Sequence, residues 1–424
     1  MLPHLDFLLG RNLNIVPDFR HEYGKAYFYA GQLKKSKELE VAVLEKRRNI
    51  LGEDHPDTLE AMHWVAWIYN ALGQFKEAEE LELLVVKKRR DILGENHLGT
   101  LKAMANLVWI YSEQGKLQQA KELQVLVLKK RSNILGDDHP DTLMSIGILA
   151  IIYTNLGREQ EAEELETQLL EKQRRILGND HLNTLTTMGN LAYTFHGLGK
   201  LREAEELEVA MLQKRRGSLG ENHPHTLLNM CHLAFIYRES GRFEEAESLD
   251  VVVLQKRRNI LGENHQHTLA TMDILASTYT ALGRFREAED LEVVVLQMQR
   301  DVLGENNPYT LHTMGNLALI YKSLGKVQEA KALETIVVDE RRVIFGGSHP
   351  HTLRAMANLG STFTKLERWQ EAEVLLVEAR EKQTAVLKAN HPHLVETMQN
   401  LAVTYTKLGK SMEAEDVNTA LKNI

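Results

Sequence analysis

Residues 56–97 read PDTLEAMHWVAWIYNALGQFKEAEELELLVVKKRRDILGENH, and variants of this stretch recur along the chain every 42 residues. We call positions 42 residues apart a column and name each column after its member in this stretch. Two columns of glycine mark the period without insertion or deletion: Gly52, Gly94, Gly136, Gly178, Gly220, Gly262, Gly304 and Gly346, and Gly31, Gly73, Gly115, Gly157, Gly199, Gly241, Gly283, Gly325 and Gly409, with Glu367 at the one gap. A fixed period of this size indicates a solenoid or propeller rather than separate domains.

Each period predicts two α-helices. Apolar residues recur at steps of three and four from Leu59 to Leu72, which is typical of one face of a helix that ends at a glycine. A second apolar face runs from Phe75 to Leu93. Proline at Pro56 and its equivalents suits the first position of a helix. Strands are the alternative, because valine runs such as 251–253 are β-branched, but the flanking Glu, Lys and Arg favour helix.

The repeat also predicts how the chain is divided. We expect an irregular N-terminal segment at residues 1–17 and a continuous all-α solenoid at 18–424, made of nine full repeats and a partial tenth. The expected repeats cover about 16–57, 58–99, 100–141, 142–183, 184–225, 226–267, 268–309, 310–351, 352–393 and 394–424.

Composition excludes several classes of protein. The 424 residues carry 51 Lys+Arg and 59 Asp+Glu, a net charge of −8, which does not suit a nucleic-acid binder. The single cysteine, Cys231, excludes a disulfide framework and a Cys-based zinc site, and is compatible with a cytoplasmic location. No apolar stretch approaches the roughly 20 residues that membrane insertion requires, and the opening residues lack the basic start of a secretion signal.

The repeating unit resembles the tetratricopeptide repeat. Its small and large positions match Ala66, Tyr69, Gly73 and Ala78, and again Ala192, Phe195, Gly199 and Ala204. The 42-residue period and the turn Leu-Gly-Glu-Asn/Asp-His-Pro-x-Thr-Leu are similar to the kinesin-light-chain subclass, also found in fungal NLR-like proteins. The resemblance covers the chain from about residue 18 and implies a right-handed superhelix of antiparallel helix pairs. Its concave wall, built mainly of first helices, would bind a peptide.

Two departures from that family are visible. No heptad-rich segment precedes residue 18, so we do not expect association with a motor heavy chain. The second helix carries an acid where the family often has a bulky apolar residue, and we expect Leu81 and Val85 to carry the packing there while the acid reaches solvent or a neighbouring base. The acids are Glu82, Glu166, Glu208, Glu292 and Glu334.

Columns that vary between repeats locate the expected groove. The packing columns of Leu59 and Met62 are nearly uniform, whereas those of Trp67 and Asn70 vary, as expected where successive positions meet different ligand groups; unselected drift is the alternative. We expect apolar anchors at Trp64, Trp67, Trp109, Tyr193, Phe235 and Leu319, basic contacts at Arg238 and Lys322, with Lys365 and Lys407 nearby, and amide contacts at Asn106, Asn190, Asn316, Asn358 and Asn400.

These amides can donate to and accept from a peptide backbone, as the resembling families use them; bonding to the neighbouring helix is the alternative. We therefore expect a non-enzymatic scaffold or adaptor that binds a protein or peptide in its groove, with apolar anchors at one end of the ligand and an acidic portion toward the other. The alternative is the ligand-sensing C-terminal repeat domain of a larger NLR-type signalling ATPase. A third hypothesis is self-association through the valine-rich second helices.

Other motifs do not support catalysis, a metal or a cofactor. One member of each histidine pair, such as His223/His225, belongs to the repeating turn, where we expect it to cap the helix. Gly409-Lys410-Ser411 resembles the end of a phosphate loop, but lacks the earlier glycine and the preceding strand, and matches the turn between helices. Cys231 and His232 are neighbours, so on a helix their side chains diverge.

Overall fold

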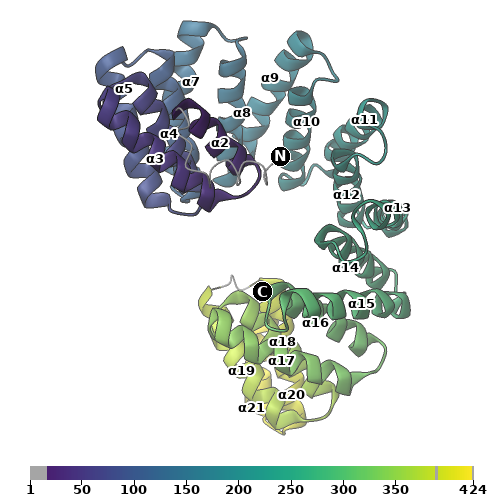
Figure 1. The fold of residues 1–424 in the computed structure, drawn as a ribbon. Helices are drawn as coiled ribbons and strands as arrows, with labels where there is room; N and C mark the ends of the chain where they lie inside the picture. The colour runs from purple at the N-terminus through teal and green to yellow at the C-terminus, as the bar shows by residue number, and fades with distance from the viewer. Residues whose placement is uncertain (1–16, 387–389, 423–424) are drawn as a thin grey trace. The chain divides into compact units, whose positions relative to one another are not determined.

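The computed structural model describes residues 17–386 and 390–422, and every regular element in these ranges is an α-helix (Figure 1). The expected irregular segment falls outside these ranges except for Pro17, which begins a helix. The helices gather into two compact units, one ending at Ser218 and the other starting at Leu219. None of the helices in this part of the chain combines the length and apolar character that crossing a membrane requires.

Long and short helices alternate with the predicted period. The first helices of the repeats are α2 (Pro17–Tyr29), α4 (Pro56–Ala71), α6 (Leu98–Glu113), α8 (Pro140–Asn155), α10 (Leu182–Gly197), α12 (Pro224–Glu239), α14 (Gln266–Ala281), α16 (Pro308–Ser323), α18 (Pro350–Lys365) and α20 (Pro392–Lys407). The second helices are α3 (Leu33–Leu51), α5 (Phe75–Leu93), α7 (Leu117–Leu135), α9 (Glu159–Leu177), α11 (Leu201–Leu219), α13 (Phe243–Leu261), α15 (Phe285–Leu303), α17 (Val327–Phe345), α19 (Trp369–Val386) and α21 (Ser411–Lys422).

The ends of these helices follow the predicted signals. The turn histidine caps the first helix, as in α4, where His55 Nδ1 accepts a hydrogen bond from the Asp57 backbone N–H at 3.2 Å. Asn307 replaces the histidine before α16 and accepts the same bond through its amide oxygen at 2.9 Å. The cap function expected of the histidine pairs is therefore confirmed; His223 accepts from the His225 N–H in the same way.

Glycine ends the first helix because the backbone turns left-handed there. Gly73 has a φ of 73°, a conformation that costs glycine little. At the gap in this column, Glu367 adopts the same conformation with a φ of 59°, so the turn survives the loss of its glycine. The helix ends are therefore set by the repeating geometry, and glycine lowers the cost of that geometry.

Within each unit, the apolar core lies between consecutive helices. In the first unit, Leu59, Met62 and Val65 of α4 pack with Val85 of α5 and Met104 of α6 in one buried cluster. An equivalent cluster in the second unit joins α15–α19. A helix pair thus completes its core against its neighbours, which is how a solenoid is stabilised.

The acids of the second helices are buried, which corrects part of the expectation for them. Glu82, Glu166, Glu208, Glu292 and Glu334 are all between 0% and 3% exposed, so none of them reaches solvent. Glu82 and Glu334 reach a neighbouring base, as expected: Glu82 Oε2 lies 3.1 Å from His63 Nδ1, and Glu334 Oε1 lies 2.9 Å from Lys322 Nζ. The acids point inward because their column lies between the two helices of a pair rather than on the outer surface.

Candidate functional site

Large apolar side chains are exposed on the first helices, in the column of Trp67. We call the surface formed by this column and those of Glu60, His63 and Trp64 the first-helix face of each unit. In the first unit, the Trp109 and Tyr193 side chains are 43% and 68% exposed, and the Trp67 and Trp109 rings stack at 6.5 Å between centroids. In the second unit, Phe235 and Leu319 are each 42% exposed. Water-facing rings of this size indicate a contact surface.

Trp64 differs from the other rings because its own chain partly covers it. The Phe28 ring of α2 meets it edge-on at 6.3 Å, and the ammonium of Lys25 lies 5.2 Å from the centre of the ring. Trp64 is therefore half-buried and joins α2 to α4. It offers a ligand only part of its surface.

The five asparagines of the Trp64 column form two groups. Asn106 and Asn316 bond to the preceding first helix, as the alternative interpretation expected. Asn106 Nδ2 lies 3.2 Å from His63 Nε2, and Asn316 Nδ2 donates to Asp273 Oδ1 at 3.2 Å. Asn190, Asn358 and Asn400 make no such bond among the described residues, and all three are half-buried. The amides of this second group are therefore available for a ligand.

Arg238 and Lys322 neutralise buried acids within their own repeats. Arg238 Nη1 lies 2.6 Å from Asp250 Oδ2, and the Lys322 and Glu334 side chains are only 9% and 4% exposed in their ion pair. Burial raises the pKa of Asp250 to about 6, and the Arg238 charge opposes that rise. These two bases thus act inside the protein and present no spare charge to a ligand. Lys365 and Lys407 lie one position further along and are exposed.

An apolar cavity of ≈ 450 Å³ opens on the first-helix face of the first unit. Met144, Ile148 and Ile151 of α8 line it together with Leu169 and Ile176 of α9. Gly147 stands in the His63 column at this point, so a bulky side chain is absent from the wall of the cavity. Asn190 also lines it, which places an available amide beside an apolar cavity.

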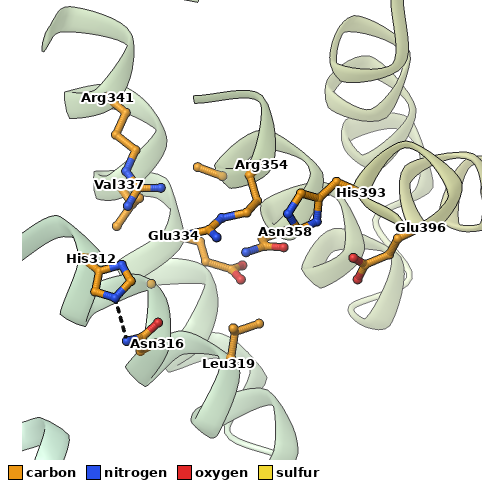
Figure 2. Close-up of a pocket in the computed structure, with 12 residues that line it drawn as sticks. His312, Asn316, Leu319, Glu334, Val337, Arg341, Arg354, Asn358, His393 and Glu396 are labelled. Atoms are coloured by element: carbon orange, nitrogen blue, oxygen red, sulfur yellow. Dashed lines mark hydrogen bonds between the residues drawn. The ribbon is translucent and has the colours of Figure 1, made fainter. Parts of the chain in front are cut away.

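A second cavity, of ≈ 260 Å³, lies between α16, α17, α18 and α20 in the second unit, and most of the residues that line it are polar or charged (Figure 2). Figure 2 shows the side chains of His312, Asn316, Arg354, Asn358 and His393 directed toward this space. Gly315 again occupies the His63 column, and a methyl group built there would meet no atom within 4 Å.

Arg354 and the two glycines were not singled out from sequence, because each looks unremarkable within its own repeat. The detectable signal was the Glu60 column, where the residue type changes sharply between repeats: Glu60, Lys102, Met144, His312, Arg354 and Glu396 all belong to it. The two glycines gave no such signal, because their column also holds Ala105, Gly189 and Ala357.

No cofactor or metal site is evident in the part of the chain described. No three His, Cys, Asp or Glu side chains there come together in a way that could hold a metal ion. Burial raises the pKa of the Cys231 thiol, which favours its unreactive protonated form.

Comparison with known proteins places these features in a family. The model of the tetratricopeptide repeat matches residues 19–83, 148–208, 225–301 and 352–419, and a second model of the same repeat matches 100–141 and 310–351. A search of curated proteins finds no match.

Three solved structures illustrate the likeness. A protein from Podosopora anserina, described as a kinesin light chain with nearly identical repeats, is 31% identical over 48% of this chain and 97% of its own, with a TM-score of 0.45. The quorum sensor NprR from B. thuringiensis is 14% identical over 87% of this chain and 98% of its own, with a TM-score of 0.56. A signal-transduction ATPase from Pyrococcus horikoshii carries a tetratricopeptide repeat sensor. It is 15% identical over 83% of this chain and 53% of its own, with a TM-score of 0.56.

Proposed function

The chain belongs to the tetratricopeptide repeat family, whose members mediate protein–protein interactions, and from that premise we propose that it binds a protein or peptide segment along its first-helix faces. The observation that carries the proposal is the exposure of Trp109, Tyr193 and Phe235 in one column. Exposed rings of this size do not stabilise the isolated protein. A partner that covers them removes their apolar surface from water, which stabilises the complex.

The two units offer different chemistry to such a partner. The first unit combines the Trp67–Trp109 stack with the apolar cavity lined by Met144 and Ile151, which suits apolar anchor residues. The second unit combines Leu319 with a polar cavity that contains Arg354. Asn190 and Asn358 line the two cavities and can bond to a backbone whatever its side chains. We propose an adaptor without enzymatic activity, acting in the cytoplasm.

Replacing both stacked tryptophans tests this proposal. The Trp67→Ala/Trp109→Ala variant is expected to weaken partner binding by about 2 kcal/mol or more, because truncating clustered aromatic anchors removes most of their buried area. A pull-down from native extract with mass spectrometry identifies the partner, and titration calorimetry measures its affinity for each variant.

The matched control is Leu83→Ala/Val125→Ala. These residues are 42% and 43% exposed on α5 and α7, the second helices of the same two repeats. The control is expected to bind like the wild type. Equal affinity of the tryptophan variant and the wild type would remove this pair from the site.

Two other functions remain alternatives. The sensor segment of a signalling ATPase would use the same first-helix faces, and the Pyrococcus horikoshii structure shows such a sensor on a similar fold. Self-association would use the exposed valines of the second helices, among them Val251 and Val293. Sedimentation that depends on concentration in the wild type, and not in a Val251→Glu/Val293→Glu variant, would favour the latter.

A further inference from the structure

We propose that the apolar cavity of the first unit binds a small organic cation, an amine or imidazole attached to an apolar group. We call it the Gly147 cavity and define it by Met144, Gly147, Ile151, Leu169, Gln173 and Asn190, which α8, α9 and α10 contribute. The inference goes beyond the proposed function, because it gives this cavity a ligand that is not part of a protein partner.

Buried acids of the second helices are matched by bases of the preceding first helix at four places in the chain. The pairs are His21–Glu40, His63–Glu82, Arg238–Asp250 and Lys322–Glu334, with nitrogen–oxygen distances of 2.9, 3.1, 2.6 and 2.9 Å. The four bases belong to two columns, those of His63 and Asn70. The fold therefore has two positions from which a base reaches a buried acid.

Glu166 has no base at either position. In its repeat the two columns hold Gly147 and Thr154. Glu166 is 2% exposed, it forms no ion pair with any described residue, and its Oε2 has no hydrogen-bond partner among them. Burial raises the pKa of Glu166 to about 7, and the nearby Thr194 hydroxyl opposes that rise only in part. A cation placed beside this carboxyl group would stabilise its ionised form.

The repeat of His63 shows where the missing base would lie. His63 Nδ1 lies 3.1 Å from Glu82 Oε2, and His63 Nε2 lies 3.2 Å from Asn106 Nδ2. The imidazole ring thus occupies the space between a buried carboxylate and an amide of the next first helix.

The same space is open at Gly147. The positions of the ring, the acid and the amide correspond, two repeats later, to Gly147, Glu166 and Asn190. Gly147 has no side chain to take the place of the ring, and the cavity opens beside it with Asn190 in its lining. In the second unit, Glu334 of the acid column lines the cavity beside Gly315, so a cavity at a glycine of the His63 column reaches this acid. A ligand nitrogen in the place of the imidazole would therefore meet Glu166 and Asn190.

The lining contains a second acceptor where other repeats have a charged donor. Gln173 stands in the column of Arg89 and Arg131, so a guanidinium group is absent from this wall. The Gln173 side chain is 6% exposed, and its Oε1 has no hydrogen-bond partner among the described residues. Because an unpaired buried oxygen destabilises the protein, a ligand N–H that bonds to Gln173 Oε1 would be favoured.

The charges around the Gly147 cavity differ from those around the cavity of the second unit, which Arg354 lines. No lysine or arginine lines the Gly147 cavity in the part of the chain that is described. Asp138 lines it, and Arg175 balances that charge at 2.6 Å. His181 lines it too, but its Nδ1 already caps α10. The cavity thus offers acceptors to a ligand and no base, which suits a cation rather than an anion.

The size of the cavity indicates a free small molecule as the occupant. Its volume of ≈ 450 Å³ is within the range of small-molecule sites, and Met144, Ile148 and Ile151 give it apolar walls. A lysine side chain from a partner is thin and would leave most of this apolar space empty. A nitrogen group attached to a ring or a branched alkyl group fills the space and removes apolar surface from water.

Phenethylamine, which joins a benzene ring to an ammonium group, tests the cavity on the full chain, with binding measured by titration calorimetry at neutral pH. Glu166→Gln is expected to weaken binding roughly tenfold or more, since a charge-assisted pair is lost. Gly147→His, which returns the imidazole of His63 to the protein, is expected to abolish binding. The matched control is Glu82→Gln, which changes the equivalent acid two repeats earlier and is expected to leave binding unchanged.

A second blocking variant guards against misfolding of Gly147→His. Gln173→Arg restores the arginine that the preceding repeat has at Arg131, so it introduces a residue that the fold already accommodates. It is expected to abolish the binding of phenethylamine, because it places a positive charge in the cavity. Thermal melting verifies that each variant is folded.

Four results would overturn the proposal: equal binding of the neutral analogue phenethyl alcohol, tighter binding of phenylacetate, unchanged affinity for phenethylamine in folded Glu166→Gln and Gln173→Arg, or tighter binding of a glycine pentapeptide with one central lysine, which would assign the site to a partner segment. The Trp67→Ala/Trp109→Ala variant separates this inference from the proposed function. It is expected to bind phenethylamine like the wild type, so loss of the natural partner in that variant leaves the cavity intact, and loss of phenethylamine contradicts it.

Discussion

Replacing Lys322 by methionine is expected to lower the free energy of unfolding of the second unit by about 3 kcal/mol, because the substitution leaves the Glu334 carboxylate buried without its base. The Lys322 and Glu334 side chains are 9% and 4% exposed and lie 2.9 Å apart. Solvent therefore does little to stabilise the Glu334 carboxylate once the lysine is gone. Urea denaturation, with hydrogen exchange of α16 and α17 as the local readout, measures the loss.

The next repeat supplies the compensating change. There, Thr364 and Leu376 stand in place of the lysine and the glutamate, and the fold keeps its helices. The double variant Lys322→Thr/Glu334→Leu is made in an Ala318→Gly background, because the next repeat has Gly360 there and a Cβ at Gly360 would come within 2.7 Å of Leu376. In that background the double variant is expected to recover most of the stability that Lys322→Thr loses, since no charge remains buried. Lys365→Met, at an exposed lysine, is the control and is expected to change little. Equal losses in the single and double variants would show that the ion pair is not the cause.

Replacing Glu292 by glutamine is expected to stabilise the protein by about 3 kcal/mol at pH 7. Burial, with the nearby Asp273 carboxylate, raises the pKa of Glu292 to about 9, against an ordinary value of 4.5. Folding at neutral pH must therefore add a proton to this carboxyl group. Glutamine needs no proton and keeps a donor toward Asp273, and Gln124 already occupies this column, where its Nε2 donates to the Ser145 carbonyl at 2.7 Å.

The effect of Glu292→Gln has a definite pH dependence. Because the folded pKa lies above the unfolded one, wild-type stability falls as pH rises from about 4.5 to about 9, and the difference between the proteins grows over the same range. Thermal and urea unfolding at pH 4.5, 7 and 8.5 measure it. Glu82→Gln is the control: Glu82 has His63 as a partner at 3.1 Å, so this variant is expected to gain nothing. A gain for Glu292→Gln that is the same at every pH would contradict the assigned proton.

The fold was predictable from sequence because its determinants are local and repeated. Gly73, His55 and Pro56 fix the ends of the helices, and each signal recurs often enough to override an ambiguous run such as 251–253. The inward direction of the acids was not predictable in the same way. Apolar residues flank Glu82 along its helix, but only the packing of the two helices decides that its column is buried.

The site was predictable in part for a related reason. The Trp67 column varies, and its members Trp109 and Tyr193 are exposed, as the variation predicted. The Asn70 column also varies, but Arg238 and Lys322 in it match buried acids twelve residues later. A column can therefore vary between repeats either because its side chains are exposed or because they pair with different residues inside the protein. Arg354 was missed because its place in the lining of a cavity depends on how α16, α17, α18 and α20 pack, which no single repeat reveals.

Site-specific photocrosslinking tests the central claim most directly. A benzophenone amino acid placed at Tyr193 lies on the first-helix face, and one at Val125 lies on a second helix of the same unit; both native side chains are exposed, at 68% and 43%. Binding along the first-helix face predicts a discrete crosslinked partner from position 193 and none from position 125, with the product lost in the Trp67→Ala/Trp109→Ala background. A partner crosslinked from position 125 and absent at 193 would contradict it.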